Sequence, residues 1–221
     1  MSRTRVEVYY DYRSPYAYLA VERAYALAVR HNAELIWKPI RLPELSSYRE
    51  RPLNSSYPKK MAYLRADLQR WAEKLGAPLT FPRGMQPQSG AVAGVVVGKQ
   101  HPLDTDAALR GALVAQARGV FDVYHRAVFR ALWGEGRNIS QPSVLQALLE
   151  GIGQDYASFH EAADAPTVHE QLRALTQEAD ERGVFGVPTC FVGDAMFWGN
   201  DRLEFVEQLL TLWEVSRARA Q

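Results

Sequence analysis

The N-terminal part of the chain alternates between strand and helix patterns. Residues 6–10 and 34–40 are rich in β-favouring side chains and predict two strands. Between them, apolar residues recur at helical spacing, which predicts a helix up to about His31; they are Tyr18, Val21, Tyr25, Ala28 and Val29. Ser14 and Pro15 stand where the cap and the first turn of this helix are expected. The order strand, helix, strand indicates a βαβ unit in a mixed or parallel sheet.

The middle of the chain has a helical pattern. Residues 41–57 are rich in Pro and Ser and show no sustained period, which predicts a long loop. From Pro58 the apolar positions follow a helix that ends at Gly76, and a proline-rich link covers residues 78–87. Further helical stretches are predicted over 88–100, 104–133, 142–150, 155–163 and 167–182. We therefore expect a helical block over residues 58–165.

The C-terminal part returns to strand patterns. Residues 186–192 and 195–198 flank a Gly193-Asp194 turn, which predicts a β-hairpin. A closing helix carries its apolar stripe at Leu203, Val206, Leu209, Leu210 and Trp213. The order of elements predicts an α/β fold interrupted by helices.

Composition and charge exclude several classes of protein. The 221 residues carry 26 Lys and Arg against 25 Asp and Glu, so no global field attracts nucleic acid. No run of about 18 apolar residues is present, and the N-terminus has no apolar signal region, so we expect a cytoplasmic protein that does not span a membrane. The single cysteine, Cys190, cannot form an internal disulfide, which agrees with a reducing compartment.

Common catalytic motifs are absent. The sequence has no G-x-S-x-G, P-loop or C-x-x-C motif, so hydrolase, nucleotide-binding and dithiol chemistry have no support from motifs. The five histidines include no i, i+4 pair and no H-x-H, so no metal site is predicted.

Two positions point to chemistry but have simpler explanations. Ser14 stands at a helix N-terminus after a strand, where an anion or a thiolate would be stabilised; capping alone would also explain it. Val187-Pro188 opens a strand in which proline removes a ladder hydrogen bond. A cis peptide is conceivable there, although trans is the ordinary state of such a bond.

Four further residues are candidates on weaker grounds. Cys190 in an apolar strand is explained as a small core side chain. Asn54 and Lys60 flank the start of the first helix of the block, where a lysine is commonly a solvated charge. Asp201 precedes the closing helix, and a helix cap is its simplest role.

Four segments together resemble the 2-hydroxychromene-2-carboxylate isomerase and kappa-class glutathione transferase branch of the DsbA family. They are Tyr10–Ala20, Asn54 with Pro58–Trp71, Gly183–Thr189 and Met196–Leu203. The resemblance spans nearly the whole chain. It implies a thioredoxin-like fold, a mixed β-sheet flanked by helices, formed by residues 1–42 and 166–221. The same resemblance implies a large all-α insertion domain over residues 43–165.

In the redox relatives the strand-to-helix turn carries C-x-x-C, and here the same positions read Ser14-Pro15-Tyr16-Ala17. Both sulfurs are missing, and thiol–disulfide exchange requires a protein thiolate. The resemblance therefore implies that bound glutathione supplies the thiol, with its sulfur beside a catalytic Ser14.

The resemblance also implies roles for other residues. Pro188 would be cis, so that the Val187 backbone pairs with the cysteinyl part of glutathione, and Asn200 and Asp201 would hold its γ-glutamyl end. Asp201 suits this task because a carboxylate pairs with an ammonium group.

On the substrate side, the resemblance implies that Asn54 and Lys60 face the gap between the sheet and the helical block, where they bind glutathione or the substrate. Tyr16 and Trp198 would form aromatic walls for the substrate. Ala17 departs from the family pattern, in which many relatives have a second serine.

The implied activity is the isomerisation of a conjugated aromatic 2-oxo acid in aromatic compound catabolism, with a small-molecule substrate and a homodimeric enzyme. Two alternatives stay open at this point. One is a kappa-like glutathione transferase or peroxidase, and the other is a non-catalytic thioredoxin-fold binding protein.

Overall fold

A computed structural model describes residues 3–50, 58–82 and 103–219. Its described residues form a four-stranded sheet in the order β2-β1-β3-β4. The strands are β1 (Arg5–Tyr10), β2 (Glu34–Pro39), β3 (Thr189–Val192) and β4 (Ala195–Trp198). β1 is parallel to β2 and antiparallel to β3, and β3 and β4 form an antiparallel hairpin. The predicted mixed sheet and its C-terminal hairpin are confirmed.

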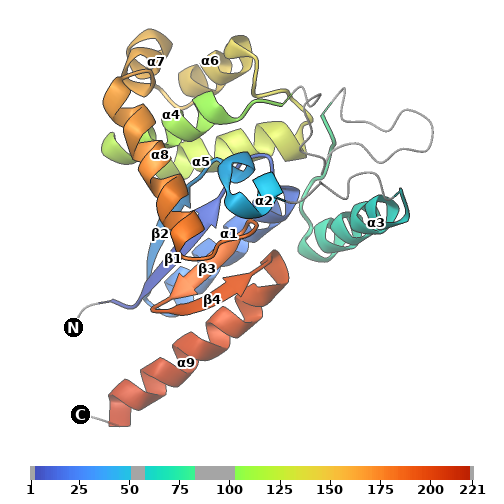
Figure 1. Ribbon diagram of the computed structural model, residues 1–221, viewed down its shortest axis with the longest axis vertical. Helices are drawn as coiled ribbons and strands as arrows, with labels where there is room; N and C mark the ends of the chain where they lie inside the picture. Colours follow the sequence, from blue (N-terminus) through green and yellow to red (C-terminus); the bar gives the residue numbers. More distant parts are fainter. Residues whose placement is uncertain (1–2, 51–57, 83–102, 220–221) are drawn as a thin grey trace.

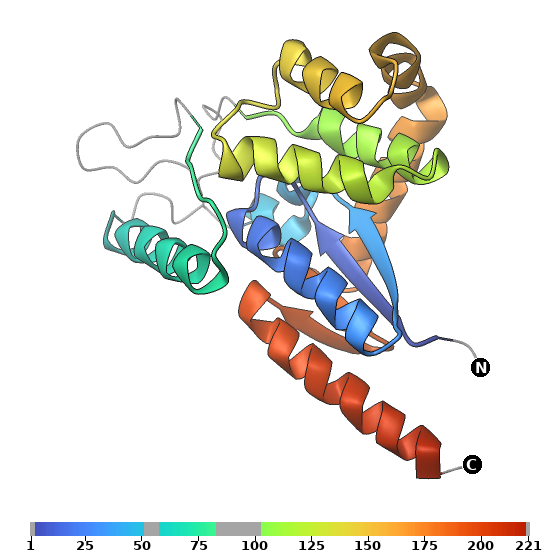
Figure 2. The ribbon, with the colours of Figure 1, turned by 180° about the vertical axis from the view of Figure 1, so that it is seen from behind.

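Helices cover both faces of this sheet and one end of it. In Figures 1 and 2, α1 and α9 lie on one face, α8 crosses the other, and α4 to α7 form a layer beyond the end of β1 and β2. The long helices are α1 (Pro15–Arg30), α3 (Pro58–Leu75), α4 (Asp106–Ala117), α5 (Phe121–Phe129), α6 (Pro142–Gly151), α7 (Tyr156–Ala163), α8 (Pro166–Glu181) and α9 (Leu203–Arg219). The short ones are η1 (Leu42–Glu44), α2 (Ser46–Glu50), the π-helical turn η3 (Arg130–Gly134) and η4 (Asn200–Arg202). None of the helices in the described ranges has the length and apolar character that a membrane crossing requires.

Alternate side chains of β1 enter two different cores, because successive residues of a strand point to opposite faces. Val8 and Tyr10 join a large buried cluster that includes Leu210 of α9. Tyr9 joins a second cluster with Ala179 of α8. The central strand β1 is therefore buried on both faces of the sheet.

The prediction of a long loop over residues 41–57 is wrong for the described part of this range, which folds into η1 and α2. Leu42 and Leu45 are buried. The N–H and the hydroxyl of Ser46 donate to the carboxylate of Asp180 at 2.8 and 2.6 Å. These partners are distant in the sequence, so no local pattern could show them.

Two further boundaries differ from the prediction. The stretch predicted over 104–133 is divided between α4 and α5, because Gly119 has a φ of +71° that favours glycine and ends α4. β3 begins at Thr189 and not at Gly186, and the Thr189 hydroxyl donates to the Gly186 carbonyl at 2.6 Å. The helix predicted over 88–100 lies outside the described residues.

Candidate active site

Ser14 lies at the junction between β1 and α1, at the C-terminal end of the parallel strands. Its backbone is extended, and its Oγ accepts the N–H of Ala17 at 3.2 Å, so the predicted helix cap is confirmed. The same hydroxyl donates to the carbonyl of Val187 at 3.0 Å, and Ser14 is only 7% exposed. The serine therefore joins the positive end of a helix to the segment before β3.

The Val187–Pro188 peptide bond is cis, as the family resemblance implied. The carbonyl of Pro188 accepts the N–H of Gly199 at 2.9 Å. This hydrogen bond brings together the two ends of the β3–β4 hairpin. The structure thus places Ser14, Val187 and Pro188 side by side, with the Gly199–Asp201 turn next to them.

Asn200 and Asp201 lie in η4, which follows β4. Asn200 is 2% exposed, its carbonyl accepts a hydrogen bond from Arg23 of α1, and its Nδ2 has no partner among the described residues. Asp201 occupies the second position of η4 and not the cap, and it pairs with Arg202 at 3.6 Å. Gly199 has a φ of +116°, and a Cβ there would lie 2.5 Å from Asp201 Oδ1. Glycine is required at this turn, which the sequence alone did not reveal.

Trp198 borders the same segment from β4. Its indole Nε1 lies so close to the Gly186 backbone that a Cβ on Gly186 would be 2.5 Å away. Trp198 packs edge-on against Phe185, with ring centroids 4.8 Å apart, and is 50% exposed. An exposed aromatic face therefore lies beside the Val187–Pro188 segment.

Three further predicted site residues are Tyr16 of α1, Lys60 of α3, and Asn54. Tyr16 donates from its hydroxyl to Asp67 of α3 at 2.8 Å. Burial and this hydrogen bond raise the pKa of Tyr16, so it remains a donor at neutral pH. Lys60 lies exposed in the first turn of α3. No described contact joins Lys60 to Ser14, and Asn54 lies outside the described residues.

Cys190 does not take part in this arrangement. It is 2% exposed within the core, and burial raises the pKa of its thiol to about 12. The predicted core role is confirmed. A neutral, buried thiol is a poor nucleophile, so the chain's single cysteine provides no thiolate at neutral pH.

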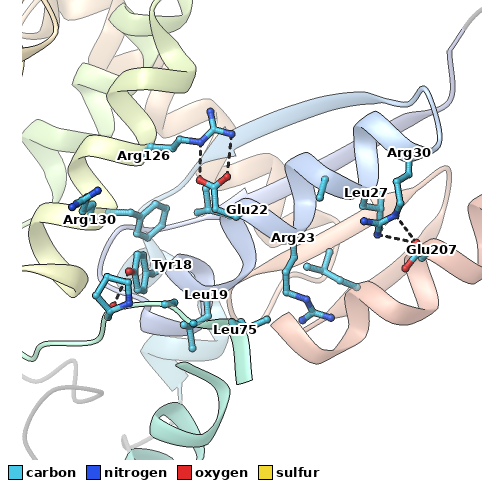
Figure 3. A pocket seen from close by; sticks show the side chains of 17 residues that line it. Tyr18, Leu19, Glu22, Arg23, Leu27, Arg30, Leu75, Arg126, Arg130 and Glu207 are labelled. Carbon is cyan, nitrogen blue, oxygen red and sulfur yellow. Dashed lines mark hydrogen bonds and ion pairs between the residues drawn. The ribbon is translucent and has the colours of Figure 1, made fainter. Parts of the chain in front are cut away.

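A cavity of about 590 Å³ follows the outer face of α1 and does not include Ser14 among its lining residues (Figure 3). Its polar walls are ion pairs: Arg126 pairs with Glu22 at 2.7 Å, and Arg30 with Glu207 at 2.8 Å. Arg23 lines this cavity and also bonds to Asn200. Arg23 therefore connects the wall of this cavity to the η4 turn.

Sequence reasoning missed two polar groups that support the site. Asp11, which is fully buried, organises the turn before Ser14, and Arg23 fixes the η4 turn against α1. The position of Asp11 between a strand and a Ser-Pro pair was the only available signal. Within the described ranges, no group of three or more His, Cys, Asp or Glu side chains is placed to hold a metal ion.

This geometry can bind a small anionic, peptide-like ligand. A helix N-terminus and a hydroxyl favour an anion, the Val187 carbonyl accepts a donor, and the Asp201 carboxylate suits an ammonium group.

Comparison with known proteins places the chain in a family. Residues 5–211 match the DSBA-like thioredoxin domain. The 2-hydroxychromene-2-carboxylate isomerase of Pseudomonas putida is 34% identical over 212 residues, which cover 93% of each chain. Glutathione S-transferase kappa 1 of Homo sapiens is 24% identical over 93% of this chain and 90% of its own.

Among solved structures, one of a 2-hydroxychromene-2-carboxylate isomerase has a TM-score of 0.82 and 30% identity, and the match covers 98% of this chain and 99% of that one. Both the sequence match and the structural match to that class thus extend over nearly the whole chain. The chain therefore belongs to the DSBA-like thioredoxin-domain family, within the branch that contains the 2-hydroxychromene-2-carboxylate isomerases.

Proposed function

We propose that this protein is a glutathione-dependent isomerase that acts on a conjugated aromatic 2-oxo acid, of the kind that 2-hydroxychromene-2-carboxylate represents. One observation carries the proposal: the Ser14 hydroxyl, at the N-terminus of α1, is hydrogen-bonded to the carbonyl that precedes cis-Pro188. The relatives named as isomerases support the reaction class. A cytoplasmic homodimer that serves aromatic catabolism is part of the same proposal.

The residues present fit glutathione. The Nδ2 of Asn200 is a buried donor without a partner among the described residues, which is uncommon for a polar group in a folded protein. A γ-glutamyl carboxylate would satisfy it, and Asp201 would pair with the ammonium of the same group. When bound, glutathione supplies a thiolate that adds reversibly to a conjugated carbon, so that a locked double bond can rotate.

Ser14 has one proton to donate, and in this structure the Val187 carbonyl accepts it. A ligand N–H that pairs with Val187 would compete for that carbonyl. The Ser14 hydroxyl would then be free to donate to an anion in front of α1. Together with the helix N-terminus, it would lower the pKa of a thiol held there.

The other residues would bind and orient the substrate. Trp198 and Tyr16 would form aromatic walls that align it. Lys60 and Asn54 would donate hydrogen bonds to an enolate or phenolate oxygen, where negative charge develops.

Calorimetric titration with reduced glutathione, repeated with S-methylglutathione, tests the cofactor site. We expect saturable binding that weakens when the sulfur is methylated and in Asp201→Ala. Absence of heat at millimolar glutathione would contradict the proposal and favour a non-catalytic binding protein.

Turnover of 2-hydroxychromene-2-carboxylate at substoichiometric glutathione tests the reaction class. We expect many turnovers per glutathione, because an isomerase regenerates it. Consumption of one glutathione per product would instead identify a transferase, an alternative that the similarity to the human kappa enzyme supports.

A further inference from the structure

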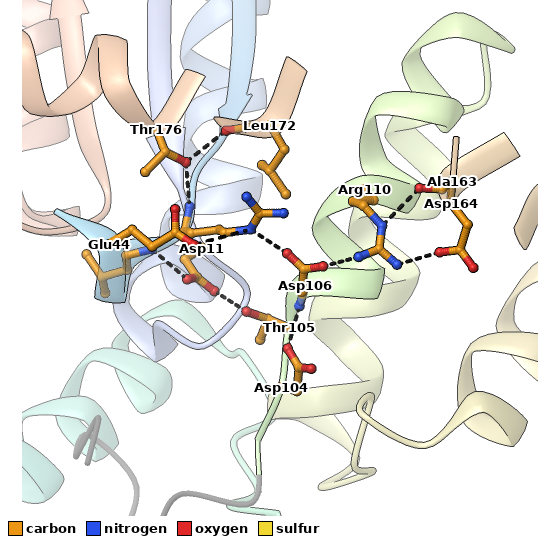
Figure 4. A network of polar contacts seen from close by, with 12 residues as sticks. Asp11, Glu44, Asp104, Thr105, Asp106, Arg110, Ala163, Asp164, Leu172 and Thr176 are labelled. Atoms are coloured by element: carbon orange, nitrogen blue, oxygen red, sulfur yellow. Dashed lines mark hydrogen bonds and ion pairs between the residues drawn. The ribbon is translucent and has the colours of Figure 1, made fainter. Parts of the chain in front are cut away.

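Asp11 is a fully buried carboxylate at the end of β1, three positions before Ser14. Its own carbonyl accepts the Ser14 N–H at 3.0 Å, which closes the turn that presents the serine. Its carboxylate accepts hydrogen bonds from Arg13 N (3.0 Å), Arg13 Nε (2.9 Å), Leu42 N (3.0 Å) and Thr105 Oγ1 (2.8 Å). Figure 4 shows this carboxylate between the residues after β2 and those before α4.

These donors come from three separate segments. A buried carboxylate is tolerated only when hydrogen bonds replace its lost hydration. Arg13 belongs to the turn itself, Leu42 follows β2, and Thr105 precedes α4. The position of the turn before Ser14 is therefore tied to the helical layer as well as to the sheet.

The Thr105 hydroxyl forms part of this connection and does not cap its own helix. It occupies the cap position of α4, but its side chain makes no capping hydrogen bond. Its hydroxyl donates to Asp11 and accepts from Arg13 Nη2 at 3.0 Å, and the residue is fully buried. A threonine in this place ordinarily stabilises its own helix. Here its hydroxyl is used at the turn before Ser14.

We propose that Asp11 and Thr105 are positioning residues. They hold the Ser14 hydroxyl within hydrogen-bonding distance of the Val187 carbonyl and next to the anion site in front of α1. This inference rests on the proposed function of Ser14. Neither residue has a described contact with Val187 or Asp201, so their effect on turnover passes through the Ser14 turn. Small displacements of a catalytic group lower rates strongly.

The test compares Thr105→Val, which keeps the side-chain shape but removes the hydroxyl, with Thr105→Ser, which keeps the hydroxyl. We expect Thr105→Val to lower kcat on the order of 10-fold to 100-fold while the KM for the substrate changes little. It should also raise the pKa of the bound thiol, read from the ultraviolet absorbance of the thiolate. Thr105→Ser should keep both the kcat and the pKa of the bound thiol close to their values in the unaltered protein.

A double-mutant cycle separates positioning from general destabilisation. In a Ser14→Ala background, Thr105→Val should cause no further loss of kcat, because the group that it positions is gone. Equal losses in both backgrounds would overturn the inference, as would an unchanged thiol pKa in Thr105→Val. If instead Ser14→Ala itself leaves turnover unchanged, the proposed function fails. Asp11→Asn, measured in the same cycle, provides a second variant should Thr105→Val fold poorly.

Discussion

The two sides of the candidate site are held in different ways. On the sheet side, Ser14 and Asn200 are 7% and 2% exposed. The Ser14 hydroxyl donates to the Val187 carbonyl, and the next carbonyl, that of Pro188, accepts the Gly199 N–H. On the α3 side, Lys60 is exposed and Tyr63 is 62% exposed. Contacts across this side include the Tyr16–Asp67 hydrogen bond and the guanidinium of Arg23, 5.3 Å from the Trp71 ring centroid.

This difference suggests a division of tasks. Groups that must keep a fixed geometry in the reaction belong on rigid elements, whereas exposed elements with few contacts can adapt to different ligands. We infer that the sheet side holds the invariant thiol ligand and that α3 adjusts to the substrate. Substitutions on the sheet side should therefore alter turnover or glutathione affinity, and those on the α3 side should alter substrate affinity.

The largest effect is expected at Ser14. Ser14→Ala and Ser14→Gly both remove the hydroxyl, but glycine preserves helix capping better than alanine. We expect both variants to lose turnover on the order of 100-fold, while Ser14→Ala is destabilised by about 1 kcal/mol and Ser14→Gly by less. Initial rates and thermal unfolding measure the two quantities. If the loss of activity in the two variants paralleled their loss of stability, Ser14 would act only as a helix cap.

A smaller effect, confined to affinity, is expected at Asp201. Asp201→Asn removes a negative charge but preserves the shape of the side chain. We expect the Kd for glutathione to rise about 10-fold, because the charge-assisted hydrogen bond is lost and the site is partly exposed. Calorimetry measures this change. Asp194→Asn, in the exposed hairpin turn, makes the same change of charge and should leave the Kd unaltered; equal weakening in both variants would point to general electrostatics.

A still smaller effect is expected from Tyr16→Phe, which removes the hydrogen bond between α1 and α3. We expect the KM for the aromatic substrate to rise about 3-fold, below the full value of a hydrogen bond to a charged group, because Asp67 can turn to water. The Kd for glutathione should not change. Tyr156→Phe, on the distant α7, is the matched control. An increase in the glutathione Kd would show that the two sides are not independent.

The sequence predicted those structural features that depend on residues close together in the chain. Ser14-Pro15 announced the helix start, and the Gly193-Asp194 turn announced the hairpin; both are present. Features that depend on distant partners could not be predicted from local patterns. Asp11 takes donors from positions 31 and 94 residues away, and α2 depends on a bond to Asp180. The family resemblance, and not the local pattern, gave the cis state of Pro188.

The smallest effect is expected at Cys190, on the sheet side but outside the site. Burial raises the pKa of its thiol to about 12, so the thiolate fraction stays negligible from neutral pH to well above it. We expect Cys190→Ala to retain glutathione-dependent turnover. Iodoacetamide should label the native protein far more slowly than the unfolded chain at the same pH, because the native thiol is buried and its thiolate fraction is small. A glutathione mixed disulfide on the native protein, or loss of turnover in Cys190→Ala, would place a protein sulfur in the reaction. Retained turnover would leave the bound ligand as the source of the thiolate, because the chain has no other cysteine.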